Sequence, residues 1–143
     1  MPAVFLLLLG CLPIPEHHRP PLDGQVLRGD APLAGATVEA CTWSTWEPFR
    51  CDAPLHAVTD DQGHFTLPGW STGVTPLLGE SPLFETVLTV CDEAGRAVAL
   101  VGAGRDPVTV QLTLGGPLVR AADPFRTSDE EAEAAGAERC AAR

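Results

Sequence analysis

The chain has 143 residues, of which 45% are apolar and 20% charged, and nine basic residues against 19 acidic ones give a formal net charge of −10. This length fits one ordinary domain that buries a real core. An acidic chain without a basic patch is a poor ligand for nucleic acid or anionic lipid head groups, so we expect no nucleic-acid partner. The five cysteines are an odd number, so at least one has a role outside an intrachain disulfide.

The N-terminal residues 1–10 are predicted to form a lipoprotein signal peptide. Residues 3–9 are an apolar run that matches the short hydrophobic core of a secretory signal. The run is too short to cross a bilayer, which takes about 20 residues. It leads into Gly10 and Cys11, which resemble a bacterial lipobox, in which the cysteine is acylated and becomes the new N-terminus. The alternative is an apolar segment with an incidental cysteine, in an ordinary soluble secreted domain.

A proline-rich segment follows over residues 11–22 and is predicted to be a tether. Four prolines in the ten residues after Cys11 oppose helix and sheet ladders and favour an extended, semi-rigid spacer. Leu12 stands where an aspartate would signal inner-membrane retention, which implies the outer membrane in a Gram-negative host. His17 and His18 are interpreted as part of a solvated linker rather than as a metal site.

From residue 23 to residue 120 the pattern changes to short strands separated by turn residues, as in a β-sandwich. The expected strands are residues 24–28, 36–43, 55–60, 64–67, 84–91, 96–101 and 108–114. The last is the clearest, because apolar and polar residues alternate along it, which puts one face in a core and the other in water. We therefore predict an all-β fold, an antiparallel seven-stranded Greek-key β-sandwich.

Two tight turns are predicted to close hairpins. The Asp60–Gly63 turn lies between the third and fourth strands, and the Asp92–Gly95 turn between the fifth and sixth. In the first hairpin, His56 and His64 fall on opposite faces, so they cannot share a metal ion. We expect His56 to be packed and His64 to be solvated. The first turn lacks the further carboxylates that a calcium loop needs, so its acidic residues are assigned to the turn itself.

Three motifs stand in order in the first half of this body: GQV at residues 24–26, PLAGATV at residues 32–38 and TDDQGHFTL at residues 59–67. Together they resemble the carboxypeptidase regulatory-like family, a prealbumin-like (transthyretin-like) sandwich found appended to enzymes and in bacterial envelope proteins. The resemblance covers residues 24–69. It implies a fold and not an activity, because these motifs set turns and fill the core and carry no catalytic residues.

Enzymes of related architecture fit the sequence poorly. Hydroxyisourate hydrolases end in a motif that contains tyrosine, and intradiol dioxygenases hold iron with two tyrosines and two histidines, whereas this chain has no tyrosine. No nucleophile elbow, phosphate loop or paired-carboxylate motif is present in the sequence. We therefore assign no catalytic residue, no metal ligand and no cofactor, and we expect a protein that is not an enzyme.

If Cys11 is lipidated, four cysteines remain, and export into an oxidising compartment predicts two disulfides. Four cysteines allow three pairings. We favour Cys41–Cys51, which closes the adjacent loop locally, and Cys91–Cys140, which attaches the tail to the sandwich. Zinc is disfavoured because the cysteines are widely spaced and lack a C-x-x-C motif.

Residues 43–54 and 68–82 are expected to be long irregular segments, which in a compact domain are functional or poorly ordered. Their aromatic residues, together the candidate ligand contacts, are Trp43, Trp46, Phe49 and Trp70. Aromatic loops at one end of a sandwich commonly make binding surfaces, and the alternative is that these side chains cap a small core. A rival function, an accessory subunit or a small hydrolase, would use the same region from Trp43 to Trp70.

The C-terminal residues 121–143 form an acidic tail with a short predicted helix. Ser128 can cap the helix, Glu131 completes a capping box, and the acidic run from 129 to 133 is interpreted as a solvated helix start. Gly136 is expected to weaken the helix.

The sequence as a whole predicts a non-catalytic envelope protein, exported and attached to the membrane through a lipid on Cys11. Its sandwich is expected to serve as a binding or structural module, with an envelope protein or a glycan as partner.

Overall fold

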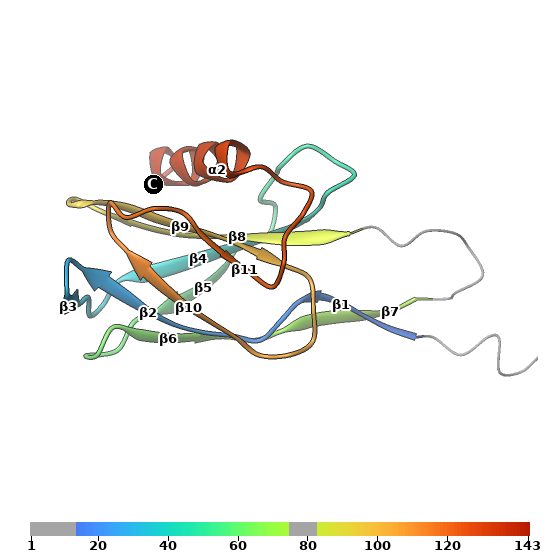
Figure 1. Cartoon of the computed structure of the whole chain (residues 1–143), viewed down its shortest axis with the longest axis horizontal. Helices are drawn as coiled ribbons and strands as arrows, with labels where there is room; N and C mark the ends of the chain where they lie inside the picture. The colour runs from blue at the N-terminus through green and yellow to red at the C-terminus, as the bar shows by residue number, and fades with distance from the viewer. Residues whose placement is uncertain (1–13, 75–82) are drawn as a thin grey trace, which may run out of the picture.

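The computed structural model describes residues 14–74 and 83–143. In these ranges a layered arrangement of strands carries helix α2 (Asp129–Ala141) on one face (Figure 1). The strands are β1 (Ile14–Arg19), β2 (Leu22–Arg28), β3 (Ala31–Pro32), β4 (Thr37–Ser44), β5 (Leu55–Val58), β6 (His64–Leu67), β7 (Trp70–Val74), β8 (Phe84–Asp92), β9 (Gly95–Gly102), β10 (Val108–Thr113) and β11 (Val119–Ala121).

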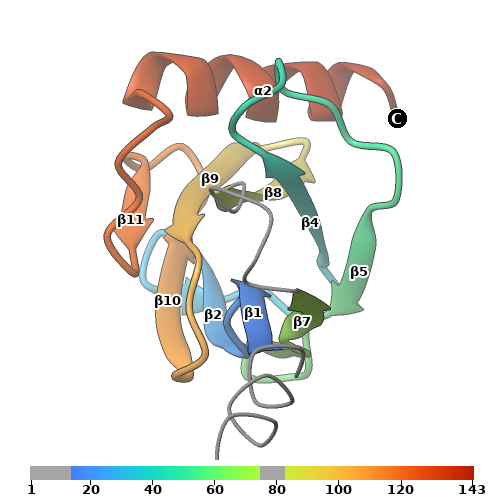
Figure 2. The same cartoon turned by 90° about the vertical axis from the view of Figure 1, so that its right-hand side faces the viewer.

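Two sheets form the body of the protein. One has five strands in the order β11-β9-β8-β4-β5, and in the other β2 pairs with β10 on one side and with β3 and β6 on the other. Seen from the end, α2 crosses the outer side of the five-stranded sheet, and β2 and β10 lie in the opposite layer (Figure 2). The predicted all-β, sandwich-like class is confirmed.

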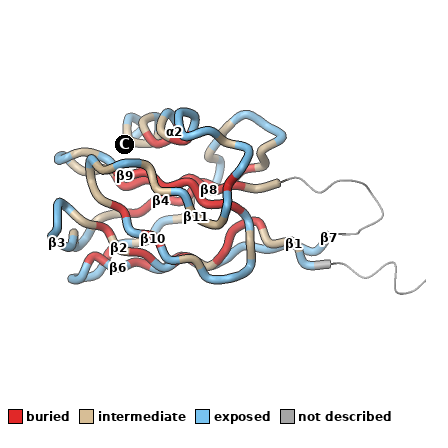
Figure 3. The backbone as a smooth tube through the Cα atoms, in the orientation of Figure 1, coloured by how far each residue is buried: buried red, intermediate tan, exposed pale blue. Residues whose placement is uncertain are grey.

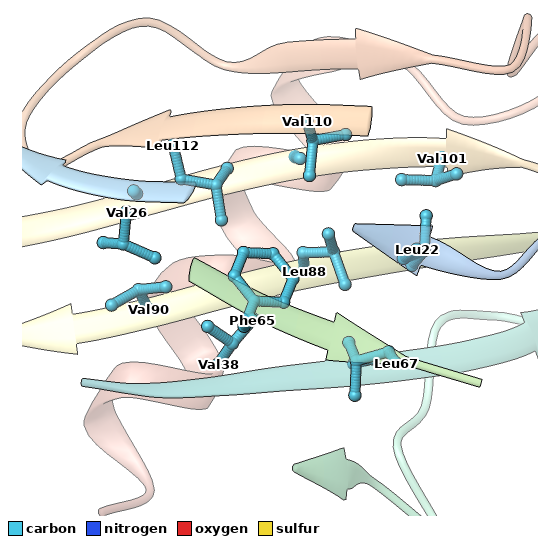
Figure 4. Packing of buried hydrophobic residues seen from close by; sticks show 13 residues of the cluster. Leu22, Val26, Val38, Phe65, Leu67, Leu88, Val90, Val101, Val110 and Leu112 are labelled. Atoms are coloured by element: carbon cyan, nitrogen blue, oxygen red, sulfur yellow. The ribbon is translucent and has the colours of Figure 1, made fainter. Parts of the chain in front are cut away.

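The main core lies between the two sheets, where buried residues concentrate (Figure 3). It forms because the apolar positions of each alternating strand face the other sheet. The large side chains that meet there are Leu22, Val26, Val38, Phe65, Leu67, Leu88, Val90, Val101, Val110 and Leu112 (Figure 4).

All seven predicted strands are present, with ends displaced by two residues or fewer, and β1, β3, β7 and β11 are additional. The pairing is mostly antiparallel. However, β10 runs parallel to β2 and β11 runs parallel to β9, so the prediction of a wholly antiparallel sandwich is wrong for these two pairs.

The predicted tether is wrong over residues 14–22, because β1 and the start of β2 lie in this stretch. β1 pairs with β7 in an antiparallel ribbon whose register runs from Ile14 opposite Val74 to Arg19 opposite Trp70. A strand in a two-stranded ribbon has one unpaired side, and proline is tolerated on such an edge. The irregular segment expected at 68–82 likewise contains β7.

The first predicted hairpin is also wrong, although its turn forms. β5 pairs with β4 and β6 pairs with β2, so the Asp60–Gly63 turn passes from one sheet to the other. The Asp60 carboxylate accepts the backbone N–H groups of Gln62 and His64 at 2.8 and 2.9 Å, and Gly63 has a φ of 74°. The second hairpin is confirmed, with Asp92 opposite Gly95 between β8 and β9.

Helix α2 begins with the predicted capping box, in which Ser128 and Glu131 each accept a backbone N–H from the other. The helix has 13 residues, longer than the short helix expected. Gly136 is buried against β9, where an added Cβ would lie 2.5 Å from Cγ2 of Val98. The glycine therefore permits the close approach of helix and sheet, which offsets its poor helix propensity.

Both predicted disulfides are present. Cys41 is bonded to Cys51 and Cys91 to Cys140, with Cα–Cα distances of 5.3 and 5.6 Å. Two disulfides are compatible with an exported protein in an oxidising environment. Glu39 lies beside the Cys41–Cys51 bridge, and these three residues are of types that bind metal ions. The two cysteine sulfur atoms are bonded to each other, however, and offer no thiolate to a metal.

The predicted signal peptide, the lipidation site Cys11 and the first part of the tether lie outside the described residues. Within the described ranges, no helix has the length and apolar character needed to span a bilayer.

Candidate functional site

The four aromatic side chains chosen from the sequence occupy different environments at one end of the sandwich. Trp43 is buried, 7% exposed, and its ring stands nearly perpendicular to that of Phe49 at a centroid distance of 4.9 Å. Trp46 is 54% exposed and Trp70 is 40% exposed. Trp43 therefore serves mainly as core, as the alternative interpretation held, whereas Trp46 and Trp70 present aromatic surface to solvent.

The expectation that His18 lies in a solvated linker is wrong, because the side chain is buried. Its ring centroid lies 4.5 Å from that of Trp70 and 3.9 Å from that of Phe84, and its Nε2 lies 2.6 Å from Oγ1 of Thr72. Burial lowers the pKa of His18, and the nearby Glu16 opposes this effect. The β1–β7 pairing places His18 here, and its ring packs against the rings of both Trp70 and Phe84.

The loop between β4 and β5 separates two hollows of about 380 Å³ each. The Cys41–Cys51 bridge attaches this loop to β4. Trp43 and Glu47 line both hollows. The helix-side hollow is also lined by Thr45, Pro48, Phe49, Arg126, Thr127, Glu131, Ala134, Ala135 and Glu138. The ribbon-side hollow is also lined by Arg19, Thr42, Ser44, Arg50, Asp52, Ala53, Leu55, Trp70 and Phe84.

Arg19 supplies the buried charge of the ribbon-side hollow. The residue is 9% exposed, and its Nε donates to the carbonyl oxygen of Pro68 at 3.1 Å. One terminal nitrogen donates to Oγ1 of Thr42, also at 3.1 Å, and that hydroxyl lies 2.8 Å from the hydroxyl of Thr86. Burial lowers the pKa of Arg19. A guanidinium nonetheless stays charged at any physiological pH.

The other charges at the ribbon-side hollow form one ion-paired group, in which two carboxylates share one guanidinium. Arg50 lies 3.2 Å from a carboxylate oxygen of Glu47 and 2.9 Å from one of Asp52, and all three side chains are more than half exposed. Within the described ranges, no carboxylate lies within ion-pair distance of Arg19. Among the described residues, Arg19 therefore has no carboxylate as a direct partner, although the surplus carboxylate of the Arg50 group lies at the same hollow.

His56 is half exposed rather than packed, because β5 lies at the edge of its sheet. Its Nε2 lies 3.0 Å from Oε2 of Glu39, a buried carboxylate. Arg139 of α2 donates to both oxygens of Glu39, at 2.5 and 3.2 Å, and Arg143 lies at 3.6 Å. This cluster attaches α2 to the sheet and accounts for His56 without a catalytic role. His64 is exposed, as predicted.

The bond between Arg139 and Glu39 predicts a pH-dependent contribution to stability. The Arg139 side chain holds the pKa of Glu39 below its ordinary value of 4.5, with smaller help from His56 and Arg143, while burial opposes the shift. A depressed pKa in the folded state gives stability that is complete above the ordinary pKa and is lost as the pH falls through the folded value. Arg139→Gln should therefore lower the free energy of unfolding at about pH 7 by more than at about pH 3.

Urea unfolding at the two pH values measures this difference. Arg105→Gln is the matched control, because the Arg105 side chain is 77% exposed and its ion-pair partner is the adjacent Asp106. An effect of Arg139→Gln that stays the same at both pH values would contradict the prediction.

Sequence reasoning missed the residues that give this end of the molecule its chemistry. Arg19 and His18 fall in a stretch that was interpreted as a solvated tether, and Thr42 was an unremarked position in a strand. The signal that could have found them is the β-compatible HHR run before the first turn, but it indicates no partner for these side chains.

Comparison with known proteins adds little. No protein family profile and no curated protein matches the chain. Among solved structures, a chlorocatechol 1,2-dioxygenase from Pseudomonas putida is similar at a TM-score of 0.40 and 14% sequence identity, over 73% of this chain and 58% of that one. This chain thus corresponds to less than two thirds of the dioxygenase, and a likeness at this level carries no argument about activity.

Proposed function

We propose that the chain is a non-catalytic envelope protein, exported and lipid-anchored through Cys11, whose sandwich recognises a ligand at the end formed by the β4–β5 loop. The observation that carries this proposal is exposed aromatic surface at two hollows: Trp70 lines the ribbon-side hollow, and Trp46 lies on the disulfide-bonded loop that separates the two. Exposed aromatic residues next to concave surfaces are typical of recognition sites.

The proposal also assigns the sandwich to the carboxypeptidase regulatory-like, prealbumin-like group, as a seven-stranded Greek key with short added strands. Contacts between the second and third motifs support this. The Thr59 hydroxyl accepts the backbone N–H of Ala36 at 2.9 Å and donates to the carbonyl of Leu33 at 2.6 Å. Gly35 and Gly63 have φ values of 69° and 74°, as turn glycines require.

The anchored location is supported by the Gly10-Cys11 motif after an apolar run and by the two disulfides. The described structure is compatible with attachment at this end, because β1 begins three positions after Cys11 and leads into the body from the free end of the ribbon (Figure 1).

One experiment tests both parts of the proposal. The full chain, with a C-terminal affinity tag, is purified from envelopes of its native host, together with a Trp46→Ala/Trp70→Ala variant and a Val58→Ala control. Val58 is 64% exposed and lines neither hollow. We expect a diacylglyceryl adduct on Cys11 in the mass spectrum. We also expect one envelope component to be recovered with the wild type and the control and lost with the double variant.

Two results would contradict the proposal. An intact Met1 at the mature N-terminus would overturn the lipid anchor. Equal recovery by all three proteins, each folded by circular dichroism, would overturn recognition at this end.

A further inference from the structure

Arg19 differs from the other buried charged side chains in how its charge is balanced. Glu39 is held by Arg139 and Arg143, and Glu85 accepts three backbone N–H groups. Arg19 contacts two neutral oxygen atoms. A charge taken out of water costs free energy unless it is paired, so Arg19, for which the described residues supply no ion-pair partner, would be stabilised by an anionic ligand in the hollow.

The guanidinium also has donors to spare. An arginine side chain presents five N–H groups, and the described contacts occupy two of them, one on Nε and one on a terminal nitrogen. Arg19 lines the ribbon-side hollow, so the remaining donors are close to a space that a ligand can enter. A planar guanidinium matches the two oxygen atoms of a carboxylate.

The walls of the ribbon-side hollow favour a ligand with a flat body. Trp70 and Phe84 meet edge to face at a centroid distance of 5.6 Å, with His18 packed against both rings. Trp70 keeps 40% of its surface exposed. An apolar ring or the face of a sugar ring would cover this surface, and burial of aromatic surface is favourable.

The rim of the hollow argues for one negative charge rather than two. The carboxylates of Glu47 and Asp52 stand there, each paired with Arg50. A phosphate dianion would bring a second charge that Arg19 alone does not balance and that these carboxylates repel. A carboxylate monoanion is repelled less than a dianion and matches the single charge of Arg19.

We propose that the ribbon-side hollow binds a small carboxylic acid, with its carboxylate on Arg19 and its flat body against Trp70 and Phe84. This inference rests on the proposed function and names the ligand class for one of its two hollows. The shared chemistry is a carboxylate on a ring, which an aryl acid or a sugar acid can supply.

The test compares an acid with its uncharged counterpart on the full chain. Tryptophan fluorescence and the melting temperature are followed during titration with 3-phenylpropionate, with 3-phenylpropionamide and with glucuronate. A ligand that binds the folded state raises the melting temperature. We expect saturable binding of at least one acid, with the aryl acid about tenfold or more tighter than its amide if the ligand body is aromatic.

Arg19→Gln should abolish this preference for the acid, whereas Arg105→Gln, which removes the same charge from an exposed site, should preserve it. If Arg19→Gln does not fold, the comparison of acid with amide on the wild type still shows whether binding requires the carboxylate. Binding of glucuronate in place of the aryl acid, with the same dependence on Arg19, would support a sugar acid as the ligand.

Equal binding of acid and amide, saturable binding of neither acid, or unchanged acid binding in a folded Arg19→Gln variant would overturn the assignment. If the acid-binding test fails while an envelope component is still recovered in a manner that depends on Trp46 and Trp70, the proposed function stands and only the assignment of a carboxylate ligand is overturned. Acid binding through Arg19 without such recovery would support the carboxylate site and contradict recognition of an envelope component.

Discussion

Replacement of Glu85 by glutamine should destabilise the protein by about 2–4 kcal/mol. The Glu85 side chain is buried, with the residue 2% exposed. One oxygen accepts the backbone N–H groups of Phe125 and Arg126 at 2.9 Å each, and the other accepts that of Thr127 at 3.0 Å. Glutamine removes the charge and turns one acceptor into an NH₂ group that faces a donor, so at least one of these backbone N–H groups loses its partner.

The segment that Glu85 holds connects β11 to α2 and contains two non-glycine residues with positive φ, Ala122 at 54° and Asp123 at 48°. Such backbone conformations persist when surrounding contacts enforce them. Urea unfolding measures the effect, and Glu93→Gln, at an exposed position in the β8–β9 turn, is the matched control. A loss for Glu85→Gln as small as that of the control would contradict the prediction.

The two disulfides should contribute unequally to stability. Removal of the Cys91–Cys140 bridge by a double Cys→Ser change should cost about 4 kcal/mol, and removal of Cys41–Cys51 about 3 kcal/mol, because a cross-link that closes a longer loop restricts the unfolded chain more. The bridges span 49 and 10 residues respectively.

Equilibrium unfolding of the two double variants measures this order. Amide exchange adds a second readout, since loss of Cys91–Cys140 should raise exchange in α2 before other elements. An equal loss from the two bridges, or a larger one from Cys41–Cys51, would show that native-state effects outweigh loop entropy here.

Features that depend on neighbouring residues were predictable from the sequence. The alternation from Val108 onward defines β10, and the Ser128–Glu131 capping box depends on residues three positions apart. Export and local loop closure together led to the correct cysteine pairing.

Features that depend on distant partners were not predictable. The turn at Asp60–Gly63 suits a hairpin and a crossing between sheets equally well, because both place Phe65 and Leu67 in the core. Arg19 and His18 owe their burial to pairing with β7, about fifty residues away, and proline content alone suggested a spacer there. The candidate site was therefore located by its aromatic residues but not by its charge.

The β1–β7 ribbon also determines how the protein would stand on a surface. A flexible coil of this length would let the domain point in any direction. Paired as a ribbon, the six residues of β1 make a stiff arm of about 20 Å that is continuous with the body. If the proposed anchor on Cys11 is present, this arm would hold the ribbon-side hollow, which lies at its base, about 20 Å from the outer end of the arm.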